Sequence, residues 1–434
     1  MNRYTQDKEK SMLRVLLLSD IHFLCMAAEH DVHFNVRKAF LQDIADYAKS
    51  RGIIDHILIS GDIANHGEKE EFEEAKKFFD DICDKSGCSS DEIYVVPGNH
   101  DKNFKEQNSP YEHIFNAGLG CSVKGKGSPE NLFYGMLEND IKFARGLYKP
   151  FKNYIEFAYG LDSVEPLMLK FLDAEGVIDY NKSDDKAYYK KCLTKLDGYD
   201  VMLYGMNSSI NCDWYDEDDN GNGHKMFLPK LAYNADADTC NFINISMMHH
   251  PTEKLVFGDD IAKVLDEKFQ IQIFGHLHNP SSNVNNAVHI HSGALQPPNS
   301  DEDYFSVYNI IEIEVMTSDN SEDKLCLKLQ VQKYDKDEQS FETDQVNSKE
   351  YTIFLKKHNN RWHNKNASVD SELPNEVTKR AVRLKFLKMT DQKVFINKYS
   401  HYNDSKSLYE NCIDFLNIVD KEHKIVDLWN DIKD

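Results

Sequence analysis

Short apolar runs that end in polar residues recur along the first two thirds of this chain. Three of them cover residues 14–20, 55–62 and 92–100, and each closes on aspartate, asparagine or histidine. An apolar run of this length, bounded by polar residues, is typical of a buried strand. The sequence therefore predicts strands whose carboxyl ends carry chemically active side chains.

Helical patterns separate these runs. Residues 36–50 and 69–82 place apolar side chains on one face at helical spacing. Alternating strands and helices predict a mostly parallel sheet, and such sheets bind their ligands at the carboxyl ends of the strands. We therefore expect the functional site at those ends.

After Asp101 the pattern becomes helical. Residues 131–160 carry aromatic and aliphatic side chains at helical spacing, which predicts a helical insertion over about residues 110–200. The aromatic side chains either pack against the core or roof the site and select substrates. The sequence leaves both alternatives open.

Strand patterns resume in the second half of the chain. Apolar runs cover residues 201–204, 242–248, 271–274 and 287–292. Residues 307–314 and 325–331 alternate apolar and polar side chains, which indicates antiparallel strands with one solvent-exposed face. These strands predict a second sheet that covers the first.

The C-terminal part divides by composition and periodicity. Residues 317–323 and 335–349 are rich in Asp, Ser, Asn and Glu and resemble linkers, and a helical pattern runs from Pro374 to the end. The final helices loosely resemble small adaptor domains that recruit a protein partner, and a packed helical cap without a partner is the alternative. The expected organisation is a main domain over residues 1–316, additional strands and linkers over 317–373, and a helical C-terminal module over 374–434.

Charge, hydropathy and cysteine spacing limit the class of protein. The formal net charge of −22 disfavours sequence-independent wrapping of nucleic acid, because such binding depends on Lys and Arg. No apolar run approaches the roughly 18 residues of a membrane helix, and residues 1–12 lack the apolar segment of a secretion signal. The nine cysteines show no CxxC spacing. We expect a cytoplasmic protein with reduced cysteines and no membrane partner.

Five short motifs at the ends of apolar runs carry chemistry. Mixed oxygen and imidazole ligands favour manganese, iron, nickel or zinc over calcium or magnesium, and the absence of thiolates argues against a structural zinc site. Glycines before Asp62, Asn99 and His276 would let the backbone turn sharply toward a ligand. The motifs are Asp20-Ile-His22, Gly61-Asp62, Gly98-Asn99-His100-Asp101, His249-His250-Pro251 and Gly275-His276-Leu277-His278.

Taken together, the motifs resemble the calcineurin-like metallophosphoesterase superfamily over about residues 13–314. With the strand order, the resemblance implies an α/β fold, a four-layer α/β/β/α sandwich of two mixed sheets flanked by helices. It implies two divalent transition-metal ions (Mn, Fe, Ni or Zn) as cofactors. The implied ligands are Asp20, His22 and His278 for the first metal, Asn99, His249 and His276 for the second, and Asp62 for both.

The resemblance also implies roles for residues beside the ligands. The family pattern places the ligand two residues before the proline, which selects His249 and leaves His250 as a neighbour of the ligands or a substrate contact. His100 matches the family's acid near the leaving group, and Asp101 would orient it.

This set of roles implies a hydrolase of phosphate esters. Two metals about 3.5–4 Å apart would share a hydroxide that attacks phosphorus, and both would clamp the phosphoryl oxygens. Phosphodiester bonds of nucleotides or nucleic acid are the expected substrates. A phosphomonoesterase or protein phosphatase on the same site is the alternative, and a scaffold with an inactive site is a third, which the complete ligand set disfavours.

Overall fold

The fold is described from a computed structural model of the 434-residue chain. The chain divides into two compact units, Met1–His358 and Asn359–Asp434, and all five motifs lie in the first. The structure describes residues 10–24, 31, 33–103, 105, 114–119, 128–139, 141–172, 186–213, 224–297, 305–318 and 322–355, and parts of 382–432.

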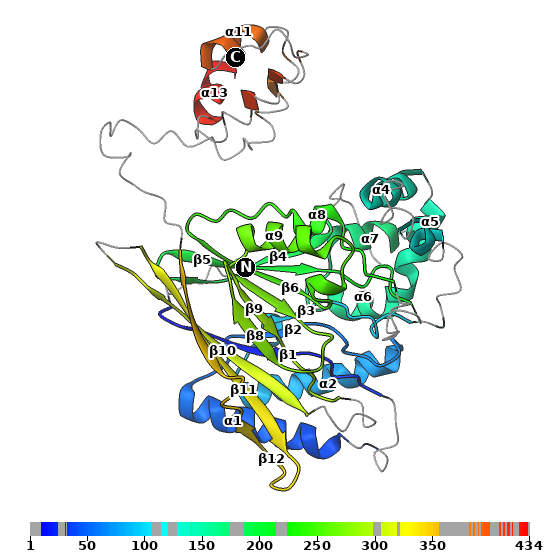
Figure 1. Cartoon of the computed structure of the whole chain (residues 1–434), viewed down its shortest axis with the longest axis vertical. Coiled ribbons are helices and arrows are strands. Elements are labelled where there is room, and N and C mark those ends of the chain that lie inside the picture. The colour runs from blue at the N-terminus through cyan, green and yellow to red at the C-terminus, as the bar shows by residue number, and fades with distance from the viewer. Residues whose placement is uncertain are drawn as a thin grey trace, which may run out of the picture. The chain divides into compact units, whose positions relative to one another are not determined.

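The first unit contains two mixed sheets that lie face to face (Figure 1). The larger sheet has seven strands in the order β12-β11-β10-β1-β2-β3, with β13 paired to β11. Strands β1, β2 and β3 run parallel, so their carboxyl ends lie along one edge. The bounds are β1 (Leu13–Leu18), β2 (His56–Ile59), β3 (Ile93–Val95), β10 (Val307–Met316), β11 (Lys324–Asp335), β12 (Ser340–Thr343) and β13 (Lys349–Phe354).

The smaller sheet has six strands in the order β4-β5-β6-β7-β9-β8. Strands β5, β6, β7 and β9 run parallel, so β6 and β7 deliver the motifs at His249 and His276 to the same edge. The bounds are β4 (Tyr188–Leu196), β5 (Tyr199–Met206), β6 (Phe242–Met248), β7 (Ile271–Phe274), β8 (Ser281–Val284) and β9 (Val288–His291).

Strand β1 is buried on both faces. Val15 and Leu17 belong to a cluster that aliphatic side chains of both sheets form between them. Leu16 and Leu18 belong to a second cluster, which includes the apolar faces of the covering helices. Because successive side chains of a strand point to opposite faces, a strand covered on both sides reads as an uninterrupted apolar run.

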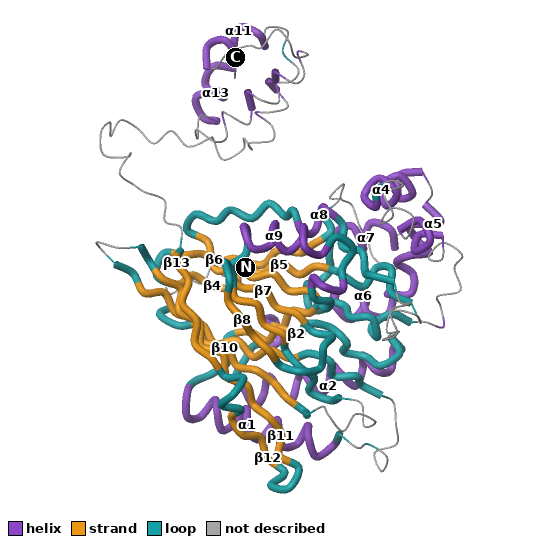
Figure 2. Tube along the Cα trace, in the orientation of Figure 1, coloured by secondary structure: helices purple, strands orange, loops and turns teal. Residues whose placement is uncertain are grey.

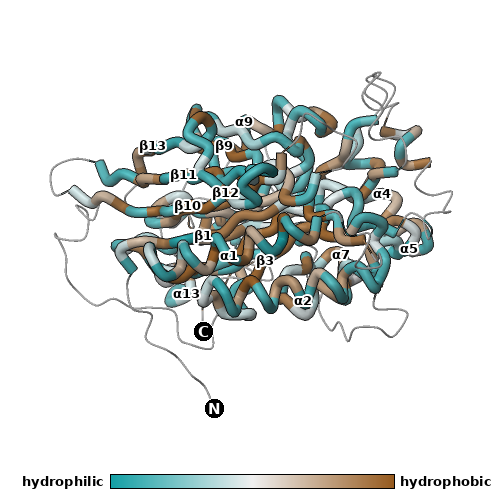
Figure 3. The backbone as a smooth tube through the Cα atoms, turned by 90° about the horizontal axis from the view of Figure 1, so that it is seen from below, coloured by the Kyte–Doolittle hydropathy of each residue, from teal (hydrophilic) through white to brown (hydrophobic). Residues whose placement is uncertain are grey.

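Helices cover the outer faces of both sheets. Helices α1 (Phe34–Arg51) and α2 (Lys69–Ser86) lie against the larger sheet, and α9 (Gly258–Lys268) lies against the smaller one (Figure 3). The short helix α8 (Lys230–Tyr233) lies beside α9 (Figure 1). The order helix, sheet, sheet, helix confirms the predicted α/β/β/α sandwich.

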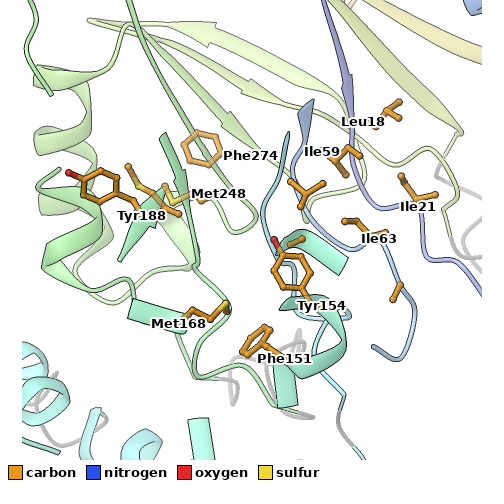
Figure 4. Packing of buried hydrophobic residues seen from close by; sticks show 14 of the residues in the cluster. Leu18, Ile21, Ile59, Ile63, Phe151, Tyr154, Met168, Tyr188, Met248 and Phe274 are labelled. Carbon is orange, nitrogen blue, oxygen red and sulfur yellow. The ribbon is translucent and has the colours of Figure 1, made fainter. Parts of the chain in front are cut away.

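Three aromatic side chains of the insertion are fully buried in the core. Phe143, Phe151 and Tyr154 have no exposed surface. Figure 4 shows Phe151 and Tyr154 in the same cluster as Ile63, near the end of β2, and Met248, at the end of β6. Of the two alternatives, core packing is the one observed. The helices are α4 (Pro129–Asn139), α5 (Ile141–Tyr148), α6 (Lys152–Tyr159) and α7 (Pro166–Leu172).

Two predicted segments contain strands that the sequence patterns missed. Strand β4 lies inside the predicted helical insertion, and in the described part of that insertion the helices end at Leu172. Strand β12 lies inside the predicted linker 335–349. Only Phe341 is buried in the four residues of β12, which is too little apolar surface to produce a recognisable alternation.

The second unit has a hydrophobic core of its own. In its described part Figure 2 shows helix and loop, including α11 (Gln392–Tyr399) and α13 (Ile425–Ile432). The residue at which the helical module was predicted to begin, Pro374, lies outside the described residues. The buried side chains are Val382, Phe386, Ile396, Cys412, Phe415, Leu416, Val419, Leu428 and Ile432.

Candidate metal centre

The five motifs meet at the carboxyl ends of the parallel strands. In the larger sheet the amide of Asp20 donates to the carbonyl of Gly61 over 3.1 Å, and the amide of His22 donates to the carbonyl of Asp62 over 3.0 Å. In the smaller sheet the amide of Gly275 donates to the carbonyl of His249 over 2.9 Å. Main-chain hydrogen bonds therefore hold the motif loops together within each sheet.

The side chains of the motifs form four overlapping groups. Within each group the ligand atoms lie within 4.8 Å of one another. We call Asp20, His22 and His278 the first half of the centre and His249, His250 and His276 the second half. Asp62 shares one group with His22 and another with His249, so it lies between the two halves. Asn99 adjoins the second half, because its Oδ1 lies 3.1 Å from Nε2 of His249. The groups are Asp20/His22/His278, His22/Asp62/His100, Asp20/Asp62/His249 and His249/His250/His276.

The backbone at this centre adopts an uncommon conformation. Five motif residues have φ between 49° and 69°, although none is glycine. A left-handed backbone at a non-glycine residue costs on the order of 1–3 kcal/mol and is concentrated at functional sites. The loops thus hold a strained geometry that the surrounding sheets must stabilise. The residues are Asp20, His22, Asp62, His276 and His278.

Three glycines leave the space that the ligands occupy. A Cβ atom at Gly98 would lie 2.0 Å from Oδ1 of Asp62, and one at Gly275 would lie 2.8 Å from Nδ1 of His249. At Gly61 the Cβ would lie 2.5 Å from the same nitrogen, and φ is +104°. The predicted turning role of glycine therefore applies at Gly61, whereas close packing is the reason at Gly98 and Gly275.

The hydrogen bonds of His249 determine which ring nitrogen faces the centre. Nδ1 lies 2.8 Å from the carbonyl oxygen of Ser60, which only accepts, so Nδ1 carries a proton. Nε2 faces Asp62, 3.3 Å from Oδ2. Burial lowers the pKa of His249, but the charge of Asp62, its hydrogen bond and the charge of Asp20 together outweigh burial and raise the pKa to about 9. In the metal-free protein Nε2 therefore holds a proton that a metal ion would displace.

Two other histidines are neutral at pH 7. Burial lowers the pKa of His22 to about 4, and burial together with the charge of His249 lowers the pKa of His276 to about 4. Both ring nitrogens of His22 are buried and make no hydrogen bond within the described part of the chain. A neutral, buried imidazole without a hydrogen-bond partner fits a metal ligand.

His100 lies beside these ligands and is held by a main-chain oxygen. The ring centroids of His22 and His100 are 4.7 Å apart. Nδ1 of His100 lies 2.9 Å from the carbonyl oxygen of Asn65, so it carries a proton. The resemblance assigned the orienting role to Asp101, whereas the observed hydrogen bond is made by Asn65.

Asp101 connects two loops of the centre. It is fully buried, and its Oδ1 accepts from the amides of Ile63 and Ala64 over 2.9 and 2.8 Å. Its Oδ2 accepts from the amide of Gly98 over 2.9 Å. Asp101 therefore ties the loop after Asp62 to the loop before Asn99.

His250 lies beside the centre and is held by Ser208. Oγ of Ser208 accepts from the amide of His250 over 2.9 Å and lies 3.0 Å from Nδ1, so one hydroxyl holds both the backbone and the ring of His250. Burial holds the pKa of His250 well below its usual range, so the ring is neutral. This Nε2 is buried without a hydrogen-bond partner among the described residues. The sequence did not distinguish the turn that carries Ser208 from an ordinary turn.

A family model described as calcineurin-like phosphoesterase matches residues 13–280, more than half of the chain. The chain belongs to the calcineurin-like phosphoesterase family. Membership implies a hydrolase acting on phosphoric ester bonds with two divalent metal ions, and the described Asp and His groups are able to hold metal.

Individual relatives of this family member are distant. A protein of Bacillus subtilis described as an uncharacterized metallophosphoesterase-like protein is 32% identical over 89 residues, which are 20% of this chain and 18% of that protein. A predicted phosphoesterase structure from Streptococcus pneumoniae shares 12% identity over 79% of this chain and 99% of that chain, with a TM-score of 0.29. A purple acid phosphatase structure from yellow lupin shares 13% identity over 80% and 55%, with a TM-score of 0.37.

Proposed function

We propose that this protein is a dinuclear metal-dependent phosphoesterase that hydrolyses phosphodiester bonds of nucleotides or nucleic acid. Asp62 is the ligand shared by both metals, and its place in groups with His22 and with His249 supports this assignment. We assign Asp20, His22 and His278 to the first metal and Asn99, His249 and His276 to the second.

The protonation states support this ligand set. His22 and His276 are neutral, and His249 directs Nε2 to the centre. Bound manganese, iron, nickel or zinc would supply a nucleophile at neutral pH and neutralise charge on the phosphoryl oxygens. We assign His250, a neutral imidazole whose buried Nε2 has no hydrogen-bond partner among the described residues, as a substrate contact.

The observation that carries the proposal is the position of His100. Its ring lies 4.7 Å from that of His22, and its Nδ1 donates to Asn65, so a protonated His100 would present its second proton at Nε2. An alkoxide leaving group, such as a sugar oxygen, needs a proton in the transition state, and a general acid contributes typically 10²–10⁴-fold. An imidazole acid beside the ligands therefore supports cleavage of esters with poor leaving groups.

A substrate panel tests the proposal. Nitrophenyl monoesters and diesters, cyclic nucleotides, and single- and double-stranded DNA and RNA are each assayed with Mn, Ni, Zn and Mg. We expect diesters to be cleaved with a higher kcat/KM than monoesters. Faster turnover of monoesters would favour the phosphomonoesterase alternative, and metal-loaded protein without turnover of any ester would refute the proposal.

Location and partners form a separate part of the proposal. Within the described residues no helix is long and apolar enough to cross a membrane. The seven described cysteines are free thiols, and a cytoplasmic location, which we propose, would keep them reduced. We further propose that the helical second unit recruits a protein partner, to be tested by comparing proteins co-purified with the full chain and with a chain ending at His358.

A further inference from the structure

Residues 252–258 follow the His249-His250 motif and form a closed loop beside the second half of the centre. A Cβ atom at Gly258 would lie 1.8 Å from the carbonyl oxygen of Thr252, so the two ends of the loop touch. Within the loop, the amide of Lys254 donates to the carbonyl of Pro251 over 3.0 Å, and its carbonyl accepts from Met226 over 2.9 Å. The backbone that presents Lys254 is therefore held on both sides.

The same loop contains an exposed aromatic residue in a strained conformation. Phe257 has φ of 57°, and 51% of its surface is exposed. Ten described non-glycine residues have positive φ, and five of them belong to the motifs. Phe257 is the one hydrophobic residue of the ten. The other four are the polar residues Asp162, Asp197, Asn241 and Gln339.

Neither the turn nor the start of α9 explains why this residue is phenylalanine. Asparagine or glycine adopts a left-handed backbone at lower cost. A half-exposed ring contributes less to the core than a buried one, because the hydrophobic gain follows the area removed from water. Strain retained at an exposed side chain therefore indicates a role outside the fold, in contact with a ligand.

Lys254 places an exposed positive charge near the second half of the centre. No carboxylate of the described residues forms an ion pair with it. The amide of Lys254 donates to the carbonyl of Pro251, which directly follows His250, so Lys254 lies next to this part of the centre. The nearby acid Asp260 pairs with Lys263 at 3.2 Å. The ammonium group of Lys254 is thus available to an anion that reaches the centre.

We propose that Lys254 and Phe257 form a subsite for single-stranded nucleic acid, in which Lys254 neutralises a phosphate next to the scissile one and Phe257 stacks on a base. This inference rests on the proposed function and specifies its substrate class. Stacking requires an unpaired base, because the bases of a duplex already stack on one another. Because the chain carries a net charge of −22, the positive charge of Lys254 would supply local attraction for the nucleic-acid strand.

Binding and turnover are measured separately, so that the inference and the proposed function can fail independently. Binding of the full-length, metal-loaded protein to a fluorescent phosphorothioate-linked single strand, which resists cleavage, is followed by anisotropy at several salt concentrations. Turnover is followed on methyl nitrophenyl phosphate, a small diester without a base or a second phosphate. Absence of turnover would refute the proposed function, and the binding result would still decide the inference.

Two substitutions in the loop test the subsite. Phe257→Asn and Lys254→Gln are each expected to weaken single-strand binding about tenfold, the scale of one base stack or one phosphate contact. Lys254→Gln should also lower the slope of log Kd against log salt by about 0.7. Phe257→Tyr should retain binding. Turnover of the small diester should stay unchanged in all three variants.

Matched controls separate the subsite from general surface effects. Lys263→Gln removes a 74% exposed charge on α9, and Phe354→Asn removes a 61% exposed ring on β13. Neither should change binding. Because asparagine tolerates the left-handed backbone, Phe257→Asn should keep or raise the melting temperature, whereas a structural ring would lower it.

Three outcomes would overturn the inference. The first is unchanged single-strand affinity in both loop variants. The second is duplex binding as tight as single-strand binding, which would exclude base stacking. The third is loss of binding to anionic phospholipid vesicles, with single-strand affinity retained, which would assign the loop to a membrane surface.

Discussion

The backbone amide of His100 donates a hydrogen bond to Oδ1 of Asp62 over 2.8 Å. The other oxygen, Oδ2, faces His249 at 3.3 Å and His22 at 3.9 Å. Burial alone would raise the pKa of Asp62, but the charges of His249 and His100 hold it well below its usual range. The ionised carboxylate of Asp62 thus contacts ligands of both proposed metals and accepts a hydrogen bond from His100, the residue proposed as the acid.

Asp62→Asn should remove metal and activity together. The substitution deletes the negative charge that both ions share. Metal affinity should therefore fall by more than the roughly 10–100-fold caused by losing a residue that only contacts a ligand. Metal content by mass spectrometry and turnover of a nitrophenyl diester are the measurements. Asp323→Asn is the control, because this buried carboxylate binds Tyr199 at 2.9 Å and Ser318 at 3.0 Å instead of the motifs. Two ions retained in Asp62→Asn would contradict the shared-ligand assignment.

His100→Asn should slow the cleavage of esters whose leaving group must be protonated. Turnover of a dinucleotide should fall by about 10²–10⁴-fold, because a sugar alkoxide needs a proton in the transition state. Turnover of a nitrophenyl diester should fall much less, since nitrophenolate departs without protonation. Metal content should stay unchanged. Equal losses on both substrates with depletion of metal would make His100 a ligand instead.

Gly98→Ala should displace Asp62. The added methyl group would lie 2.0 Å from Oδ1 and 2.5 Å from the amide nitrogen of Asp62, so the loop must move. We expect loss of metal and a lower melting temperature. Gly135→Ala in α4 is the control, because its Cβ meets nothing within 4 Å, and helix propensity predicts a gain of about 1 kcal/mol. Full metal content in Gly98→Ala would show that the loop tolerates the methyl group.

The metal-free protein should lose stability at alkaline pH. The pKa of His249 is about 9 in the folded state, above its ordinary value of 6.5, so its contribution is fully present below pH 6.5 and is lost as pH rises through 9. Melting temperatures in chelator should fall across this window, and His249→Gln should flatten the profile. Metal affinity should rise by up to tenfold per pH unit toward pH 9, because the ion displaces the proton on Nε2. A flat stability profile would contradict the proposed ion pair with Asp62.

Removal of residues 359–434 should leave metal content and small-diester turnover unchanged. All proposed ligands lie in the first unit, and the second unit has a hydrophobic core of its own. Circular dichroism and the nitrophenyl diester assay are the measurements. Loss of both folding and turnover in the shortened chain would show that the second unit supports the first.

Sequence patterns predicted the fully buried strands well and the partly exposed edge strands β4, β8 and β12 poorly. Strand β1 is buried on both faces, so Val15–Leu18 reads as a continuous apolar run. Strand β4 lies at the edge of its sheet and mixes buried and exposed residues irregularly, with a register shift between Cys192 and Thr194. A helical period could not be told from a strand period there, and the four-residue β8 and β12 each bury a single side chain.

At the candidate site, the sequence predicted which side chains come together but not the backbone contacts that hold them. Residue types and their order identified the motif residues that the structure brings together. The carbonyl of Asn65 that binds His100 could not be predicted, because every residue has a carbonyl and only the folded loop places this one. Ser208 was missed for a related reason, since its contact with His250 joins segments 42 residues apart.

The left-handed backbone at Asp20, His22, Asp62, His276 and His278 limits how this centre could be engineered. Copying only the motif side chains onto the strand ends of another protein would place those residues in the ordinary right-handed or extended regions and point their ligand atoms elsewhere. A transplant would have to include the buried carboxylate of Asp101 and the clearance at Gly61, Gly98 and Gly275. The smallest portable unit is therefore the set of strand-end loops with their supports, and designers of artificial metalloenzymes should graft conformations as well as residues.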